Sequence, residues 1–205
     1  IVAGLFGKQI GRTASHWVTS LGVATSFVLS LVVLKDVVID GAAIYNQSVY
    51  TWMVSDGITF EVGFLIDSLT ALMMAVVTAV SLMVHIYTIG YMSEDPGYQR
   101  FFSYISLFTF SMLMLVMSNN FMQLFFGWEA VGLVSYLLIG FWYKKETAIY
   151  ANMKAFLVNR VGDFGFLLGI ACILMYTGSL DYYEVFNKAD VLSASTMEIF
   201  DGQPW

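Results

Sequence analysis

The chain lacks the residues on which most cofactor and metal sites are built. It has two histidines and one cysteine among 205 residues, and neither a GxGxxG nor a P-loop pattern occurs. This scarcity predicts no haem, iron–sulfur or zinc site, and no dinucleotide or nucleoside triphosphate site, in the chain itself. Cys172, the one cysteine, stands in an apolar run. It has no partner for an internal disulfide, and a buried packing role is predicted.

Charge is equally scarce. Charged residues make up 12% of the sequence and hydrophobic residues 59%, whereas about a quarter of the residues in an ordinary soluble domain are charged. This composition excludes a typical soluble domain. We therefore expect residues 1–205 to form one all-α unit, a polytopic transmembrane helical bundle.

The apolar runs are long enough to cross a membrane. A bilayer core of about 30 Å needs about 20 mostly apolar residues per helix. The expected spans are 15–35, 65–90, 101–118, 119–142 and 153–178. The segments 36–61 and 179–205 are expected outside the membrane, and the residues before Lys8 are interpreted as the end of a preceding helix.

The direction of insertion follows from the basic residues, which are retained on the cytoplasmic side. Two basic residues fall in one set of alternate segments, Lys35 and Lys188, and five fall in the other set, Lys8, Arg12, Arg100, Lys144 and Lys145. This asymmetry predicts that the segments around 8–14, 92–100 and 143–152 are cytoplasmic. The loops 36–61 and 179–205 are then non-cytoplasmic.

One carboxylate falls in the middle of an expected span. Glu129 is the only formal charge between Asn119 and Trp142, and it lies about 15 Å from the helix start. An acidic residue at this depth costs roughly 2.5–3.5 kcal/mol on insertion scales, so such residues usually face a bundle interior or water. Burial disfavours the charged form and a nearby cation favours it. Glu129 is therefore predicted to be a proton-relay group, with a structural hydrogen-bonded carboxyl as the alternative.

A second group of charges lies on the expected 153–178 helix. Arg160 and Asp163 are three residues apart and share a face, so an ion pair is predicted. This pair either orders the bundle or takes part in transport. Lys154 stands six residues before Arg160, and it either extends to the interface or points inward toward Glu129.

Two further candidates lie on the 65–90 helix. Asp67 and His85 are 18 residues apart, which is five helical turns, so both lie on one face. His85 titrates near neutral pH and could relay protons, or it could be a hydrogen-bonded packing residue. Asp67 follows an acidic loop and is suited to cap the helix.

The segment Gly127–Gly140, with the sequence GWEAVGLVSYLLIG, is followed by Met153–Phe156 (MKAF) and Asn159–Asp163 (NRVGD). Together these residues resemble the antiporter-like L subunits of bacterial NADH:quinone oxidoreductase, respiratory complex I, and their mitochondrial counterpart, subunit 5. The similarity runs from about Trp52 to about Phe186. It implies a bundle of about fourteen helices built from inverted five-helix repeats.

The resemblance also implies roles for individual residues. Glu129 matches the membrane-embedded proton-relay carboxylate, and Arg160 and Asp163 match a charged pair linked to coupling between modules. From their positions in the sequence alone, Lys154 is expected to modulate Glu129, and His85 and Asp67 are weaker candidates. The family's central lysines would lie after Trp205.

The implied function is proton translocation, coupled to quinone reduction elsewhere in an oxidoreductase complex. No cofactor or metal is expected in this chain, while NADH, FMN, iron–sulfur clusters and quinone would be bound by partner subunits. The expected partners are other membrane subunits of complex I, above all a neighbouring antiporter-like subunit, and the lipid bilayer, with no nucleic acid. The implied location is the bacterial inner membrane.

Two alternatives remain open at this stage. The large subunit of multisubunit Na⁺/H⁺ antiporters shares much of the same motif, although the sequence of residues 98–166 is more similar to the respiratory subunit. A non-conducting membrane scaffold would use its buried charges only to hold helices together. Glu129 has no obvious partner on its own helix, which argues against the scaffold.

Overall fold

The computed structural model describes the chain except for residues 1, 56–57, 195–197, 201–202 and 205. Its main elements are five helices that are long and apolar enough to cross a membrane. They are α2 (Gly7–Leu34), α3 (Ser68–Tyr91), α4 (Tyr98–Val116), α5 (Phe121–Ile139) and α6 (Glu146–Thr177). A short helix α1 (Val2–Leu5) precedes them, and a π-helical segment η1 (Lys35–Ile39) continues α2.

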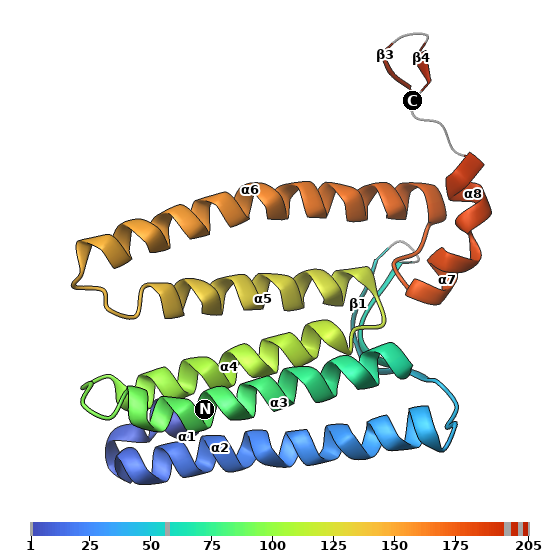
Figure 1. The fold of residues 1–205 in the computed structure, drawn as a ribbon. Coiled ribbons are helices and arrows are strands. Elements are labelled where there is room, and N and C mark those ends of the chain that lie inside the picture. Colours follow the sequence, from blue (N-terminus) through green and yellow to red (C-terminus); the bar gives the residue numbers. More distant parts are fainter. Residues whose placement is uncertain (1, 56–57, 195–197, 201–202, 205) are drawn as a thin grey trace.

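The long helices run back and forth alongside one another (Figure 1). Helices α3 and α4 both pack against α2 and against each other, α5 packs on α4, and α6 packs on α5. The start of α2 and the turns 92–97 and 140–145 lie at one end of the bundle, which we call the basic end because it carries Lys8, Arg12, Arg100, Lys144 and Lys145. The opposite end is called the hairpin end.

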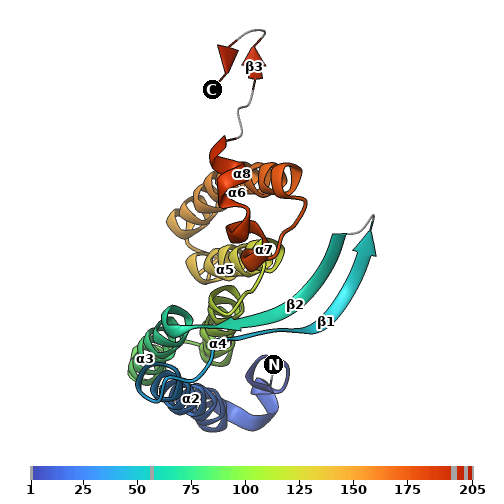
Figure 2. The same ribbon diagram turned by 90° about the vertical axis from the view of Figure 1, so that its right-hand side faces the viewer.

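The hairpin end is named for strands β1 (Tyr45–Ser55) and β2 (Ile58–Ile66), which pair antiparallel with Tyr45 opposite Ile66. Figure 2 shows this hairpin as a curved ribbon extending from the helices. The same end carries α7 (Tyr182–Asn187) and α8 (Ala189–Ala194). A second hairpin, β3 (Glu198–Phe200) and β4 (Gln203–Pro204), follows α8.

Buried polar side chains hold the hairpin end together. The Asn120 side chain caps α5 by accepting from the Gln123 amide at 2.8 Å, and it donates to the Glu61 carbonyl at 3.2 Å. Gln123 in turn accepts from the Gly63 amide at 2.9 Å. The amide of Tyr182 donates to the carbonyl of Asn119 at 3.1 Å. These bonds fix the start of α5, and with it the depth of every residue along that helix.

The structure corrects several boundaries expected from hydropathy. The segment 36–61 contains strand β1 and the beginning of β2, because its β-branched and aromatic residues favour pairing. The span expected at 65–90 begins at Ser68, since β2 continues through Ile66 and Asp67 caps the helix. The tail 179–205 includes α7, α8, β3 and β4.

Two helices are longer than the apolar runs that predicted them. Helix α2 begins at Gly7 instead of residue 15, with a backbone break at Gly11, where φ is 77°. Helix α6 begins at Glu146, inside the expected loop 143–152. In both cases polar residues extend the helix past its apolar part, because the backbone hydrogen bonds of a helix do not require apolar side chains.

The α4–α5 contact depends on the absence of a side chain at Gly127. A Cβ atom built on Gly127 would lie 2.7 Å from the Leu115 Cα atom. Replacing Gly127 with Ala should therefore force the helices apart and destabilise the protein by about 1–3 kcal/mol. The measurement is reversible unfolding of the full-length protein in mixed micelles.

Gly162→Ala on α6 is the matched control, since a Cβ atom there meets nothing within 4 Å. It should be neutral or stabilise the helix by up to about 1 kcal/mol. Equal destabilisation by the two substitutions would contradict the packing argument.

Asp95 connects two turns at the basic end. Its Oδ2 accepts from the Trp142 indole at 2.9 Å, and its Oδ1 accepts from the Gly97 amide at 2.7 Å. These two bonds, followed by the charges of Arg100 and Arg12, lower the pKa of Asp95 below its ordinary value of 3.8. Because the folded-state pKa is lowered, the stabilisation is present above the ordinary pKa and is lost as the pH falls through the folded-state value.

Asp95→Asn should accordingly lower the unfolding temperature modestly near neutral pH, and the difference from the parent should shrink as the pH is brought below about 4. Thermal unfolding across this pH range measures the effect. Glu94→Gln, at the exposed neighbouring position, provides the control. A difference between Asp95→Asn and the parent that stays constant down to acid pH would refute the assignment.

Candidate functional site

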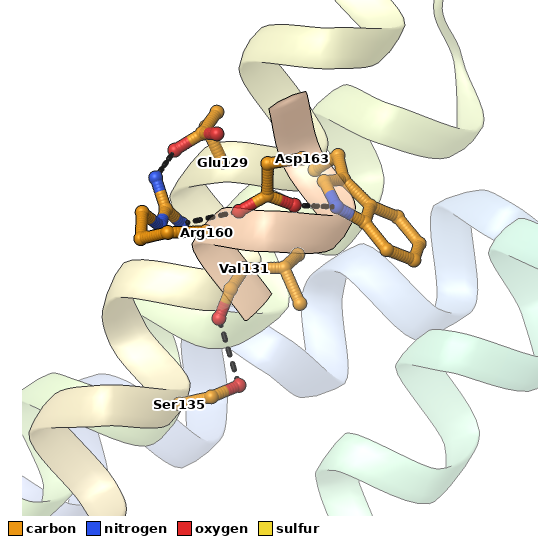
Figure 3. A network of polar contacts seen from close by, with 6 residues as sticks. Glu129, Val131, Ser135, Arg160 and Asp163 are labelled. Atoms are coloured by element: carbon orange, nitrogen blue, oxygen red, sulfur yellow. Dashed lines mark hydrogen bonds and ion pairs between the residues drawn. The ribbon is translucent and has the colours of Figure 1, made fainter. Parts of the chain in front are cut away.

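Glu129, Arg160 and Asp163 form one charged cluster between α5 and α6 (Figure 3). One guanidinium nitrogen of Arg160, Nη1, pairs with Glu129 Oε2, and the other, Nη2, lies 3.0 Å from Asp163 Oδ2. The Arg160–Asp163 pair expected from sequence is therefore present. The partner of Glu129 is found on the neighbouring helix, and one cation serves two carboxylates.

The fourth member of the cluster is Trp128, which precedes Glu129 on α5. Its indole Nε1 donates to Asp163 Oδ1 at 2.6 Å. The ring also packs edge-on against Phe166, with the ring centroids 5.8 Å apart. Asp163 is thus held between Arg160 on its own helix and Trp128 on α5.

Burial differs sharply between the two carboxylates. The side chain of Asp163 is 7% exposed, whereas those of Glu129 and Arg160 are 25% and 32% exposed. Asp163 is fixed by two partners and largely shut away from solvent. Glu129 has Arg160 as its ion-pair partner among the described residues and is the more accessible group. It is therefore the carboxylate better placed to exchange a proton.

The cluster lies deep within the helices. Glu129 is the ninth residue of the 19-residue α5, and Arg160 is the fifteenth of the 32-residue α6. At 1.5 Å per residue, Glu129 is about 12 Å from the start of its helix, close to the middle of a bilayer. The Arg160 guanidinium also lies 5.0 Å from the centre of the Phe156 ring, so an aromatic face contributes to holding the cation.

Lys154 is not part of this cluster. Its side chain is exposed, and it forms no ion pair with any residue that the structure describes. Within the described residues, no ion pair joins Lys154 to Glu129.

Asp67 and His85 also lie outside the cluster. Asp67 is the N-cap of α3, with Oδ1 accepting from the Thr70 amide at 2.7 Å. His85 is completely buried between α3 and α4. Its Nδ1 lies 2.8 Å from the Ser81 carbonyl and its Nε2 lies 3.1 Å from Ser106 Oγ. Within the described residues, no hydrogen bond or ion pair joins either side chain to Glu129.

Two features of the site could not be assigned from the sequence. The Glu129–Arg160 pair joins residues 31 positions apart, so it depends on how α5 packs on α6. Trp128 belongs to the segment that carries the family resemblance, yet its role is visible only in three dimensions. A useful signal was available, since a tryptophan in an apolar helix needs a hydrogen-bond acceptor when its N–H is buried.

Comparisons with known proteins give a consistent result. Residues 52–102 match the family described as the N-terminus of NADH-ubiquinone oxidoreductase (complex I), chain 5. Residues 118–201 match the transmembrane family of NADH:quinone oxidoreductase and Mrp antiporter subunits. Together the two matches take in α3, most of the first hairpin and all of α5 and α6.

The chain is 62% identical over its whole length to NADH-quinone oxidoreductase subunit L of Neisseria meningitidis serogroup B, and it covers 31% of that protein. It is 47% identical over 94% of its length to subunit L of Rickettsia felis, covering 30% of it. The structure of the Mrp complex from Dietzia sp. DQ12-45-1b superposes with a TM-score of 0.77 at 24% identity, over 95% of this chain and 20% of that one. This last likeness shows a shared fold. The chain spans less than a third of the length of these curated relatives.

The bond between Trp128 and Asp163 can be tested with a double-mutant cycle. Trp128→Phe keeps the aromatic packing and removes the N–H donor, while Asp163→Ala removes the acceptor oxygens. Because a hydrogen bond to a charged group contributes about 1.5–3 kcal/mol, we expect a coupling of about that size in the unfolding free energy of the full-length protein.

The same cycle with Trp142→Phe and Asp95→Ala is the matched control, since that pair is also an indole N–H bonded to a carboxylate but is exposed. Its coupling should be smaller. Strictly additive effects of the Trp128 and Asp163 substitutions would show that this bond does not hold the cluster.

Proposed function

Because the chain belongs to the family of complex I chain 5 and Mrp antiporter membrane subunits, we propose that it is a proton-translocating part of an L-type subunit of NADH:quinone oxidoreductase. The observation that carries this proposal is the arrangement of Glu129 and Asp163 around one guanidinium in the middle of the helices. In that arrangement Glu129 is the group that takes up and releases the proton.

The mechanism follows from the sharing of Arg160. While the guanidinium is paired with Glu129, the negative form of that carboxylate is stabilised by an adjacent positive charge. When Arg160 moves toward Asp163, Glu129 is left without its counter-charge in surroundings of low dielectric constant. The protonated form is then favoured. A small movement of one cation therefore changes whether Glu129 carries a proton.

Asp163 and Trp128 have a positioning role in this scheme. The indole N–H fixes one oxygen of Asp163 at 2.6 Å and leaves the other facing Arg160. A fixed second acceptor gives Arg160 a defined alternative to Glu129. Lys154, on the same helix as Arg160, is a secondary candidate that would alter the local field from the side of the basic end.

In the complete assembly, redox chemistry would occur in other chains. We propose that NADH, FMN, iron–sulfur clusters and quinone are bound by partner subunits, and that this chain contributes translocation to the oxidoreductase without a redox site of its own. Its proposed partners are membrane subunits of complex I, including a neighbouring antiporter-like subunit. The proposed location is the inner membrane of a bacterium, in keeping with its bacterial relatives.

The Mrp-type Na⁺/H⁺ antiporter is the second candidate function. The shared fold of the Dietzia Mrp complex is compatible with it. The identity of 62% to a respiratory subunit L over the whole chain favours the respiratory function. Copurification of the full-length protein with NADH dehydrogenase activity distinguishes the two, because a stand-alone antiporter has no such partners.

The decisive substitution is Glu129→Gln in the full-length protein within its complex. It keeps the size of the side chain and removes the proton-binding carboxylate, so proton pumping in inverted membrane vesicles should fall at least about tenfold. Glu129→Asp should retain part of the activity. The readout is NADH-driven quenching of a pH-sensitive dye in sodium-free buffer, with the amount of assembled complex measured in parallel.

Glu184→Gln makes the same chemical change at an exposed position on α7 and should leave pumping unchanged. Assembled complex with normal pumping in the Glu129→Gln variant would exclude the relay role. That result would favour the scaffold interpretation, in which the charges only hold α5 against α6.

A further inference from the structure

We propose that a cavity at the basic end of the bundle binds the phosphodiester headgroup of an anionic phospholipid. The cavity, called here the basic pocket, has a volume of about 650 Å³ and lies between the start of α2, the turn 92–97 and the turn 140–145. Its lining includes Lys8, Asp95, Arg100, Lys144 and Lys145. This site is separate from the Glu129 cluster and does not depend on the proposed relay.

The charge of the lining favours an anion. Four basic side chains face one carboxylate, and they come from three different parts of the chain. Basic pockets between helices on the cytoplasmic side of a membrane are suited to anionic headgroups. Asp95 reduces the net charge of this lining to +3, and its two oxygens already accept hydrogen bonds from Trp142 and Gly97.

Several donors in this pocket have no acceptor. The Nε–H of Arg100 is buried and makes no hydrogen bond within the described part of the chain. Its Nη2 donates to the Phe141 carbonyl at 3.1 Å, which fixes the guanidinium in place. Lys8 and Lys144 form no ion pair with residues that the structure describes. A phosphate group, with several acceptor oxygens, can pair with the two ammonium groups together, while the charge of the Arg100 guanidinium adds to the attraction.

The apolar part of the lining points to a lipid as the source of that phosphate. Tyr104, Phe141, Trp142 and Tyr143 form the aromatic wall of the pocket, and aromatic side chains of this kind are typical of the membrane interface. Next to the pocket, α1 and the residue after it expose Val2, Leu5 and Phe6, at 47%, 72% and 53%. These side chains offer an apolar surface along which acyl chains can lie. A free phosphate ion has no apolar part and would not bind to this surface.

Small residues give the pocket its shape. Gly4, Gly7 and Gly97 belong to the lining. A Cβ atom on Gly97 would lie 2.6 Å from the Phe141 ring, and one on Gly7 would lie 2.8 Å from Gln99 Cβ. These close approaches let the turns and helix starts meet around a cavity while the basic side chains reach over it.

The test uses the full-length protein in its complex, delipidated in detergent and titrated with phosphatidylglycerol in mixed micelles of phosphatidylcholine. Bound lipid is counted by native mass spectrometry, and the midpoint of thermal unfolding is recorded. Lys8→Gln combined with Lys144→Gln should weaken phosphatidylglycerol binding to the affected site about 30-fold, since each basic residue near an anionic lipid contributes about a fivefold factor.

The matched control is Lys35→Gln combined with Lys188→Gln, which removes the same charge at the hairpin end. Lys35 pairs with Asp40 and the Lys188 ammonium donates to the Thr177 carbonyl, so neither belongs to the basic pocket. The control should bind phosphatidylglycerol within about twofold of the parent. Both variants retain the helices' apolar faces, so loss of assembly is not expected and is checked in the same spectra.

Inorganic phosphate and pure phosphatidylcholine form the two comparison arms. Neither should raise the thermal midpoint as phosphatidylglycerol does. The proposal is overturned if the Lys8 and Lys144 variant binds phosphatidylglycerol as well as the parent, or if the control loses it equally. It is also overturned if inorganic phosphate or phosphatidylcholine produces the same effect.

Discussion

The sharing of one guanidinium by two carboxylates, deep between α5 and α6, is the constraint on which the rest of the molecule depends. Charged groups at this depth are stable only when they are paired or reach water. Arg160 with Glu129 and Asp163 leaves one formal negative charge in excess. A proton on either carboxylate would balance the set. The ion pairs therefore stabilise these charges inside the membrane, and the negative charge left over favours the binding of one proton.

The geometry of this cluster is set by two other features of α5. Gly127 lets α5 approach the backbone of α4 at Leu115, and the Asn120 cap fixes where α5 begins. From that start, Trp128 and Glu129 follow at fixed heights along the helix. The hairpin end thus determines which residues of α6 the acidic side chain can reach. A shift of one residue would turn Glu129 by about 100° around the helix axis and away from Arg160.

The sequence predicts the helical class and the chemistry better than it predicts the contacts. The apolar runs along the sequence identify five helices, and the charge within 119–142 identifies Glu129. The three-residue spacing identifies the Arg160–Asp163 pair, because contacts within a helix follow from its period. The Glu129–Arg160 and Trp128–Asp163 contacts depend on the packing of two helices, which a single sequence does not encode in any local pattern. The sequence analysis missed the β1–β2 hairpin for a related reason. Hydropathy indicates whether a segment lies in the membrane, but it does not indicate whether strands pair.

The surroundings of α6 indicate how the cluster can be controlled from outside. Within the described chain, α6 packs against α5 and, near its end, against α7 and α8. Near Asp163 this helix also exposes large apolar side chains, with Val161 76% exposed and Phe164 65% exposed. Whatever covers these side chains in a complete assembly touches the helix that carries Arg160. A displacement of α6 relative to α5 would change the distance from Arg160 to Glu129, and that from Asp163 to Trp128, while Arg160 and Asp163 would move together because both lie on α6. The Arg160–Glu129 ion pair is therefore more sensitive to helix movement than the Arg160–Asp163 pair. Because of this difference, a movement of α6 can change the protonation of Glu129.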